Sequence, residues 1–315
     1  MKLDFNSSSP PLVSVIIPTY NHAQFIGKAI ESVLCQSYNN LELIVVDNYS
    51  TDNTKEEIQS FQNDRILYYP FRNDGIIAAS RNFGVDKANG EIIAFIDSDD
   101  EWHQEKLSLE VGHLNEDGIK CVATDFVPFG NVVMWRNHLK FRKGDSYRDY
   151  SYDDIAIQNP VVNSSAILYK STFIDSGRLD EDPEFVAFED WDLWLRACGK
   201  GKIRIINKVL VKYRIHSGNT RDKRDVHSRS IKLLNKHKNI GLIDNKLYNV
   251  AYGSRSLLLA KANLDANDSD CIKYYAIAFW YTKGFQNKLR SLVGIILFML
   301  PSSVRKWVIY LLHNM

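Results

Sequence analysis

Short runs of β-branched and other apolar residues alternate with helical patterns over the first hundred residues of the chain. The run Val13–Ile17 predicts a buried strand, and the apolar residues that follow recur at helical spacing and predict a helix over Gln24–Gln36. The alternation continues with strands at Leu43–Val46, Ile66–Tyr69 and Ile92–Ile96, and with helices that run to about Phe61 and over Ile76–Lys87. This pattern predicts an α/β fold with a mostly parallel central sheet flanked by helices, in which ligands bind beyond the carboxyl ends of the strands.

The pattern changes twice further along the chain. Periodicity is lost over about Val127–Gln158, which predicts a long functional loop with short elements. Strand patterns return at Ala166–Tyr169 and Ile203–Val211, and a helix is predicted between them at Asp190–Cys198. After Arg221 the predicted elements are all helices, at Ser228–His237, Leu247–Ala262 and Cys271–Thr282. We therefore expect two regions, an α/β domain over residues 1–220 and a helical region over residues 221–315.

The composition is that of a folded, water-soluble protein, because 45% of the 315 residues are hydrophobic and 24% are charged. The net charge of +1 hides an uneven distribution. Residues 201–315 hold 21 lysines and arginines against six aspartates and no glutamate, whereas residues 1–200 hold 18 basic and 32 acidic side chains. The acidic N-terminal part, residues 1–200, and the basic C-terminal part, residues 201–315, therefore need separate explanations.

Cysteine spacing and hydropathy bear on the compartment. The four cysteines lie far apart with no C-x-x-C pair, which disfavours a zinc site and a disulfide framework and favours reduced thiols in the cytoplasm. The first eleven residues lack the pattern of a signal peptide. The most apolar stretch, Leu292–Leu300, is far shorter than the ~20 residues of a membrane span.

Acidic residues follow two of the predicted strands directly. Asp47 comes after Leu43–Val46, and the sequence Asp97-Ser98-Asp99-Asp100 comes after Ile92–Ile96. Carboxylates together with phosphate oxygens are the hard ligands that Mg²⁺ or Mn²⁺ prefers. The alternative is an acidic turn that caps the next helix near Trp102.

Six sequence motifs, in order, resemble those of family 2 glycosyltransferases with the GT-A fold. The similarity covers about residues 13–218. The motifs are VSVIIPTYN at Val13–Asn21, ELIVVDNYSTDNT at Glu42–Thr54, AASRNFG at Ala78–Gly84, GEIIAFIDSDD at Gly90–Asp100, FEDWDLWLR at Phe188–Arg196 and YRIHSG at Tyr213–Gly218. The resemblance implies a nucleotide-sugar donor, with a UDP-sugar favoured, a divalent metal, Mn²⁺ or Mg²⁺, and transfer with inversion at the anomeric carbon.

The resemblance also implies residues of the donor site. Pro18, Thr19 and Tyr20 match the loop along the nucleoside, and Asp47 matches the carboxylate that accepts a hydrogen bond from the base. The sequence departs from the family at Asn48 and Tyr49, where Asp and Gly are frequent. Arg81 matches an arginine near the donor; the alternative is an arginine on a helix surface.

Metal and phosphate contacts follow from the same resemblance. Asp97, Ser98 and Asp99 match the D-x-D motif of the donor site, with Asp99 the expected metal ligand and Asp97 expected at the ribose or in the metal's water shell. His216 is expected to reach the metal or the diphosphate from the far side, although a lone histidine is also a common surface or core residue.

The general base is expected at Asp190, in the pair Glu189-Asp190 that the family places at the start of a helix below the acceptor. A sugar hydroxyl is a poor nucleophile, and a positioned carboxylate that takes its proton contributes about 10²–10⁴-fold in rate. The alternative for such a pair is that it complements the helix dipole.

The basic C-terminal region has three interpretations. Its charges are dispersed and form no recognisable nucleic-acid module, so we expect no nucleic-acid partner. Apolar stripes flanked by Lys and Arg over residues 287–315 favour helices on an anionic membrane surface, and packing on the catalytic domain is the alternative.

The expected function is non-processive transfer of one sugar to a glycan acceptor, with a lipid-linked glycan preferred, in surface polysaccharide biosynthesis. The expected location is the cytoplasm, at the inner face of the plasma membrane if the C-terminal helices bind lipid. The alternative is a non-catalytic GT-A-like binding module, or a basic membrane or nucleic-acid adaptor. Nucleotidyl transfer is disfavoured because P-T-Y-N replaces the glycine-rich phosphate loop after the first strand.

Overall fold

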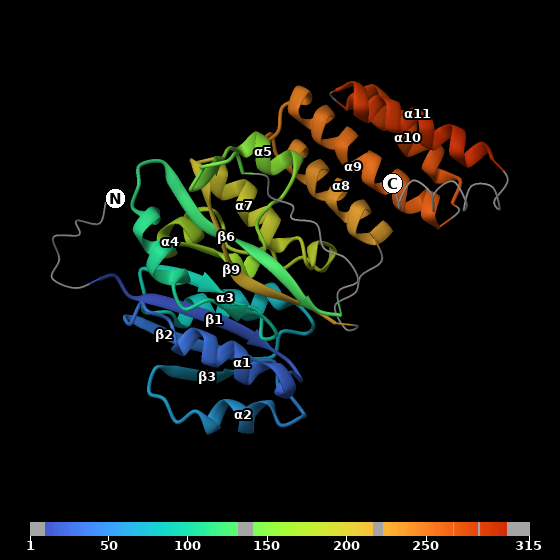
Figure 1. Ribbon diagram of the computed structural model, residues 1–315. Helices are drawn as coiled ribbons and strands as arrows, with labels where there is room; N and C mark the ends of the chain where they lie inside the picture. The colour runs from blue at the N-terminus through green and yellow to red at the C-terminus, as the bar shows by residue number, and fades with distance from the viewer. Residues whose placement is uncertain (1–9, 132–140, 217–222, 267, 283, 301–315) are drawn as a thin grey trace. The chain divides into compact units, whose positions relative to one another are not determined.

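The structure, a computed structural model shown in Figure 1, describes residues 10–131, 141–216, 223–266, 268–282 and 284–300. By its internal contacts the chain divides into two units. The first consists of residues 1–155 and 159–220 and contains the sheet, and the second consists of residues 156–158 and 221–315 and is helical.

The sheet begins with four parallel strands in the order β3-β2-β1-β4. The strands are β1 (Val13–Thr19), β2 (Leu41–Asp47), β3 (Ile66–Pro70) and β4 (Ile92–Phe95), and the helices between them are α1 (Ala23–Leu34), α2 (Thr54–Ser60) and α3 (Ile77–Lys87). All seven residues of β1 are buried, as expected for a central strand that is covered on both faces. The elements predicted for the first hundred residues are confirmed.

Alternate residues of β1 face two different layers of helices. Val15 and Ile17 belong to a hydrophobic core that also contains Ile30 of α1 and Leu107 of α4 (Lys106–Leu114). Ile16 points to the opposite face. There it packs so close to α3 that a Cβ atom at Gly84 would lie 2.6 Å from its Cγ2. Helices α1 and α4 therefore cover one face of the sheet, and α3 covers the other.

The second half of the sheet is mixed, and this part differs from the expected mostly parallel arrangement. Beyond β4 the strand order is β8-β6-β9-β5, and β7 pairs with β9. The strands are β5 (Glu101–Trp102), β6 (Ile119–Gly130), β7 (Tyr147–Tyr150), β8 (Ala166–Tyr169) and β9 (Lys202–Ile215). Strand β8 is antiparallel to both of its neighbours, while β6 and β9 are parallel to each other. The sequence pattern did not predict β6, because it carries buried polar residues, such as Thr124 and Asp125, within its apolar run.

The remaining elements of the first unit are short. They are α5 (Tyr152–Ile157), whose last two residues are counted with the second unit, the 3₁₀ turn η1 (Asn163–Ser165), α6 (Lys170–Asp175), the 3₁₀ turn η2 (Pro183–Phe185) and α7 (Glu189–Cys198). The predicted helix at Asp190–Cys198 is confirmed and begins one residue earlier. The predicted strand at Ile203–Val211 is longer at both ends, because β9 continues beside β6 as far as the pair Gly130–Ile215.

The second unit is built from α8 (Lys223–Asn239), α9 (Asn245–Asp265), α10 (Asp270–Tyr281) and α11 (Phe285–Met299). Part of its core lies between α9 and α10, where Ala260 and Leu264 pack with Cys271 and Tyr275. Within the described ranges, none of the helices combines the length and the apolar character that a membrane crossing requires. Residues 301–315, the second half of the predicted membrane-binding segment, lie outside the described residues.

Candidate active site

The carboxyl ends of β1, β2 and β4 meet at one edge of the sheet and bring three predicted motifs together. Thr19 pairs in register with Asp47, and β1 is parallel to β4 as well as to β2. Because the strands run the same way, Tyr20, Asp47 and the acidic segment after β4 all leave the sheet at this edge. Pro18 and Thr19 are the last two residues of β1, and both are buried in the strand.

Asp47 is almost fully buried, and its carboxylate already accepts several hydrogen bonds. Oδ2 accepts from the Tyr68 hydroxyl at 2.7 Å, and Oδ1 accepts from the backbone N–H of Ser50 at 3.0 Å and from its hydroxyl at 2.5 Å. Burial and the Asp47 carboxylate both raise the pKa of Tyr68, so its phenol remains a donor. Sequence reasoning missed Tyr68, because only the register between β2 and β3 brings it to Asp47.

An open pocket lies beside this edge. It is lined by Tyr20, Asn48, Tyr49, Arg72 and Asp74. Tyr20 and Tyr49 are each about half exposed, and the Arg72 guanidinium lies 5.5 Å from the centre of the Tyr49 ring. Two flat aromatic rings and a guanidinium plane are the groups on which a nucleobase stacks. Tyr20 was predicted for this purpose. Asn48 and Tyr49 entered the sequence argument only as departures from the family, and Arg72 and Asp74 not at all.

The acidic segment after β4 is held in a defined conformation. Asp100 is buried and accepts from the Ser164 hydroxyl at 2.5 Å and from the backbone N–H of Arg214 at 2.8 Å. The Asp99 carboxylate lies 3.1 Å from Nε2 of His216. Asp97 is the most open of the three, with 30% of its side chain exposed. The structure therefore places His216 beside Asp99, while Asp97, in the same segment, is paired with Arg81.

The electrostatics of this segment fit a bound cation. Burial, followed by the neighbouring Asp97 charge, raises the pKa of Asp99 against the opposing influence of His22 and His216. Burial and both neighbouring aspartates raise the pKa of Asp100 well above its usual value. A divalent cation would relieve this crowding of carboxylates, and the oxygen donors present suit Mg²⁺ or Mn²⁺. Three or more His, Cys, Asp or Glu side chains arranged around one point do not occur in the part of the chain that the structure describes. The chain would therefore supply only some of the ligands.

A second histidine also lies beside the D-x-D segment. Nδ1 of His22 lies 2.6 Å from the Ser98 hydroxyl, and the His22 ring lies edge-on to that of His216, with centres 6.1 Å apart. Ser98, predicted as a donor-binding residue, is buried and is occupied by this contact. The sequence signal for His22 was its position between the end of β1 and the start of α1.

Arg81 connects the two acidic motifs of the sequence. Its side chain is buried on α3, Nη2 donates to Asp97 at 2.6 Å, and Nη1 donates to Glu189 at 2.6 Å. Burial lowers the pKa of Arg81, but the charges of Asp97 and Glu189 more than offset this and raise it. The second oxygen of Glu189, Oε2, is buried and has no hydrogen-bond partner among the described residues. The bridge brings the start of α7 to the end of β4.

Asp190 lies at this junction, in the first turn of α7. It is half-buried, and Oδ1 accepts from the backbone N–H of Trp191 at 2.6 Å. Burial and then the Glu189 charge raise the pKa of Asp190 to about 7, against the opposing charge of Arg81. Trp191 and Trp194, on the same helix, are buried, so neither ring is exposed as a surface on which a sugar could stack. A carboxylate with a pKa near neutrality can take up a proton during a reaction at physiological pH.

Comparison with known proteins places this arrangement in a family. The model of glycosyl transferase family 2 matches residues 14–174. An uncharacterised glycosyltransferase of Rickettsia felis is 32% identical over 71% of this chain, and the chain covers 36% of its length. TuaG of Bacillus subtilis, a putative teichuronic acid biosynthesis glycosyltransferase, is 30% identical over 65% of this chain and 79% of its own length. WfgD of Escherichia coli is named as a UDP-Glc:alpha-D-GlcNAc-diphosphoundecaprenol beta-1,3-glucosyltransferase, and it is 30% identical over 65% of this chain and 77% of its length.

Solved structures share the fold. Residues 1–349 of S. aureus TarS in complex with UDP-GlcNAc align with a TM-score of 0.62 at 15% identity, over 91% of this chain and 90% of that one. The mannosyltransferase PcManGT of Pyrobaculum calidifontis, in complex with GDP-Man and Mn²⁺, aligns with a TM-score of 0.61 at 17% identity, over 95% of this chain and 84% of that one. The chain therefore belongs to glycosyl transferase family 2, whose model matches residues 14–174, and it has the GT-A fold.

Proposed function

We propose that the protein transfers one sugar from a nucleoside diphosphate sugar to a hydroxyl of a glycan acceptor, with inversion at the anomeric carbon. The observation that carries the proposal is the Arg81 bridge, in which one buried guanidinium holds Asp97 of the donor motif and Glu189 of the acceptor motif at 2.6 Å each. Two motifs about ninety residues apart in the sequence thus become the two sides of one site. A binding module without catalysis needs no such junction.

The donor's nucleoside occupies the pocket between Tyr20 and Tyr49, where a base can stack on aromatic rings beside Arg72. Asp47 lies behind it, and its oxygens retain acceptor capacity beyond the bonds from Ser50 and Tyr68. The UDP-GlcNAc and UDP complexes of TarS, which share this fold, support a UDP-sugar as donor.

Asp99, with His216 beside it, would bind a divalent cation, Mn²⁺ or Mg²⁺, at the diphosphate, and Asp97 would act through the water shell of that cation. The Mn²⁺ complex of PcManGT supports this assignment. A cation bound there would neutralise negative charge on the nucleoside diphosphate leaving group. Arg81 keeps Asp97 pointing to the site, and His22 orients Ser98 between the two aspartates.

Asp190 acts as the general base. Its carboxylate takes the proton of the acceptor hydroxyl while that oxygen forms a bond to the anomeric carbon, and the bond from this carbon to the diphosphate oxygen breaks with its electron pair on the diphosphate. A single displacement from the opposite face inverts the configuration. The pKa of about 7 at Asp190 suits this role, because the group is then both ionised in part and basic enough to accept the proton.

Substitution of Asp190 tests the mechanism. We expect Asp190→Asn to fold and bind nucleotide but to lose about 10²–10⁴-fold in kcat, because the amide cannot accept the proton. In the wild type, kcat should rise with pH through about 7, as the carboxyl ionises.

The matched control is Asp153→Asn, an exposed carboxylate in the first turn of α5, which complements a helix dipole without touching the site. Near-normal turnover of Asp190→Asn would contradict the base assignment. Nucleotide binding by the wild type without any transfer or hydrolysis would instead favour a binding module.

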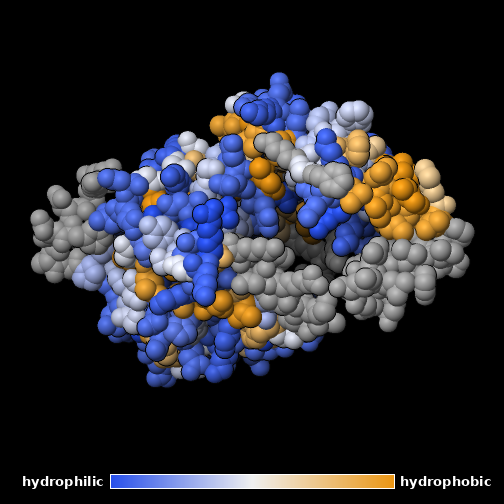
Figure 2. Space-filling model, turned by 45° about the horizontal axis from the view of Figure 1, so that its top comes forward, coloured by the Kyte–Doolittle hydropathy of each residue, from blue (hydrophilic) through white to orange (hydrophobic). Residues whose placement is uncertain are grey.

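The acceptor is proposed to be a lipid-linked glycan presented at the inner face of the plasma membrane. The name of the WfgD relative, which specifies a diphosphoundecaprenol acceptor, supports this class. Large apolar side chains of α10 and α11 are exposed in the second unit, and Figure 2 shows apolar surface gathered there. They include Trp280 of α10 and Leu289, Leu292, Ile296 and Met299 of α11, and the cations Lys288 and Arg290 also lie on α11.

Co-sedimentation with vesicles tests the membrane contact. We expect binding to vesicles that contain anionic phospholipid, weaker binding at high salt and less binding by Lys288→Gln/Arg290→Gln, since each cation near such a surface contributes about 1 kcal/mol. Equal binding of both proteins to neutral and anionic vesicles, or none to either, would refute the electrostatic contact.

A further inference from the structure

The turn before β8 lies against the acidic segment after β4. These two strands are antiparallel, with Ala94 opposite Ile167, so the residues that precede β8 lie beside those that follow β4. The 3₁₀ turn Asn163–Ser165 therefore packs against Asp97–Trp102. Ser164 in this turn is almost completely buried and has no part in the chemistry described above.

Ser164 makes three hydrogen bonds that span the acidic segment. Its hydroxyl accepts from the backbone N–H of Asp97 at 3.0 Å and donates to the Asp100 carboxylate at 2.5 Å. Its carbonyl oxygen accepts from Nε1–H of Trp102 at 2.7 Å. One residue thus fixes the beginning and the end of the segment that carries Asp99, without itself occupying the donor site.

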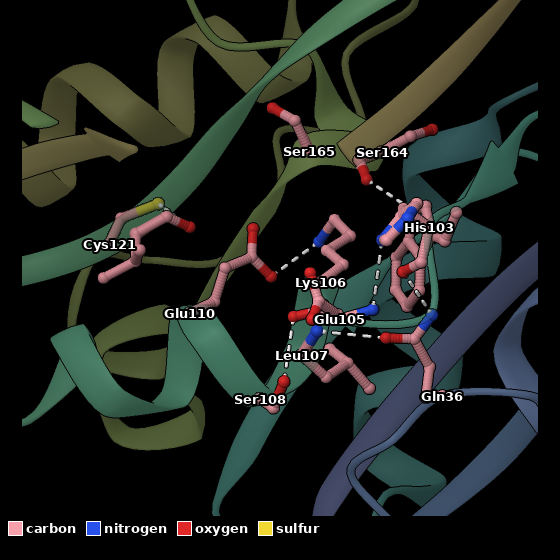
Figure 3. A network of polar contacts seen from close by, with 12 residues as sticks. Gln36, His103, Glu105, Lys106, Leu107, Ser108, Glu110, Cys121, Ser164 and Ser165 are labelled. Carbon is pink, nitrogen blue, oxygen red and sulfur yellow. Dashed lines mark hydrogen bonds and ion pairs between the residues drawn. The ribbon is translucent and has the colours of Figure 1, made fainter. Parts of the chain in front are cut away.

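A buried ion pair lies against Trp102. Figure 3 shows the two side chains of this pair, Lys106 and Glu110, pointing toward each other. The Lys106 ammonium lies 4.1 Å from the centre of the Trp102 ring and 2.7 Å from the Glu110 carboxylate. Both charged side chains are fully buried. Gln36 anchors the start of their helix, because its amide donates to the His103 carbonyl at 2.9 Å and accepts from Leu107 N–H at 3.0 Å.

A fully buried ion pair contributes little to stability by itself, because the loss of hydration offsets the attraction between the charges. Here the pair fixes the orientation of one side chain, because the Lys106 ammonium lies above the indole ring of Trp102, which donates to the Ser164 carbonyl. The neighbouring residue in the turn acts on the same site: with its amide oxygen facing Arg81, Asn163 accepts from Nε at 3.1 Å and Nη2 at 3.3 Å.

We propose that Ser164 is a positioning residue of the donor site, because it holds the segment Asp97–Trp102 in the conformation that presents Asp97 and Asp99. Trp102, held by the Lys106 ammonium above its ring, fixes Ser164 in turn. The inference rests on the proposed function, because it assigns the effect to the donor. Loss of the Ser164 hydroxyl frees the Asp97 N–H and the buried Asp100 carboxylate together, so the segment shifts. A displacement of about 1 Å in such a group can cost 10²-fold in rate.

The test compares Ser164→Ala with Ser165→Ala. The Ser165 hydroxyl is equally buried in the same turn, but it donates to the Val162 carbonyl and not to the acidic segment. For Ser164→Ala we expect kcat/KM for the donor to fall about 10–100-fold. Calorimetry should also show weaker binding of the nucleoside diphosphate (UDP, GDP or dTDP, with Mn²⁺) that the wild type binds best, with KM for the acceptor unchanged. Ser165→Ala should match the wild type in these measurements, even where both variants lower Tm.

Trp102→Phe is the second variant, for the case that Ser164→Ala does not fold. It keeps an aromatic ring under Lys106 but removes the donor to the Ser164 carbonyl, and kcat/KM for the donor should fall about two- to tenfold. The positioning role is overturned if the folded variants keep the wild-type donor KM and nucleotide affinity. It is also overturned if Ser165→Ala lowers kcat/KM for the donor as much as Ser164→Ala does. If the wild type binds none of these nucleotides, the proposed function fails first and this inference fails with it.

Discussion

Two buried arginines of the first unit hold pairs of carboxylates in different surroundings. Arg81 bridges Asp97 and Glu189 at the edge of the sheet where the strands end. Arg204 on β9 holds Asp149 at 2.7 and 3.0 Å and also pairs with Glu116, and its guanidinium lies 3.7 Å from the centre of the Tyr147 ring.

The difference lies in what burial does to the carboxylates. At Arg204, the hydrogen bond from the arginine and that from His113 lower the pKa of the largely exposed Glu116, so the ion pair favours the charged form. At Arg81, burial and a second carboxylate raise the pKa of Asp190 to about 7, although the same arginine opposes the shift. An arginine alone is therefore not the mark of a site. A surplus of buried carboxylates that one arginine does not neutralise is the sign of chemistry.

The largest effect on transfer is expected when lysine replaces the arginine of the first cluster but not that of the second. Arg81→Lys should lower transfer by about 100-fold and the free energy of unfolding by about 1–3 kcal/mol, because an ammonium cannot donate to two carboxylates as a planar guanidinium does. The control is Arg204→Lys, which should also lower Tm but should leave kcat/KM within about threefold of the wild type, since no part of the donor site depends on it. Equal losses of activity in both variants would mean that Arg81 is only structural.

The fully buried pair of α4 has the same charges but no access to solvent, and the main effect expected there is on stability rather than on transfer. Lys106→Met should lower the free energy of unfolding by about 3–5 kcal/mol, because it leaves Glu110 buried without its partner. The exposed pair Lys28–Glu31 has the same 2.7 Å separation and is the control, since Lys28→Met should leave the urea midpoint unchanged. A similar shift for both variants would contradict the effect of burial.

The smallest effect is expected when both charges of the buried pair are removed. Lys106→Met/Glu110→Met should unfold within about 1–2 kcal/mol of the wild type, as apolar side chains of similar size replace the pair. Burial raises the pKa of Glu110 from 4.5 to about 7, so between these values the folded state binds more protons than the unfolded state. The wild type should therefore lose stability relative to the double variant as the pH rises from 4.5 to 7. A constant difference between the two urea midpoints across this range would show that Glu110 keeps an ordinary pKa.

Sequence reasoning reached those parts of the site that lie on local patterns. The strands before Asp47 and Asp97 are short apolar runs, and the helix after Glu189 has a clear helical period, so these carboxylates could be placed at strand ends and at a helix start. Arg81 was expected near the donor, but neither its burial nor its bridge to Glu189 could be predicted. That bridge joins residues 108 positions apart, and such a contact depends on how α3 and α7 pack.

The groups that were missed all come from pairing between distant segments. Tyr68 reaches Asp47 through the register of β3 on β2, and Ser164 reaches Asp97 through the antiparallel contact of β8 with β4. His22 reaches Ser98 across 76 positions of sequence. None of these residue types is unusual in its own sequence window, and only His22, directly before α1, has a position that offered a local signal.

The sequence by itself determined most of the elements, the family and the order of the acidic motifs, because hydrophobic period and short motifs are properties of neighbouring residues. The tertiary structure decided which of the acids are paired with an arginine and which have a raised pKa. Those properties depend on burial and on charges a few ångströms away in space, and the distance between two charges is fixed only when the strands and helices that carry them have packed.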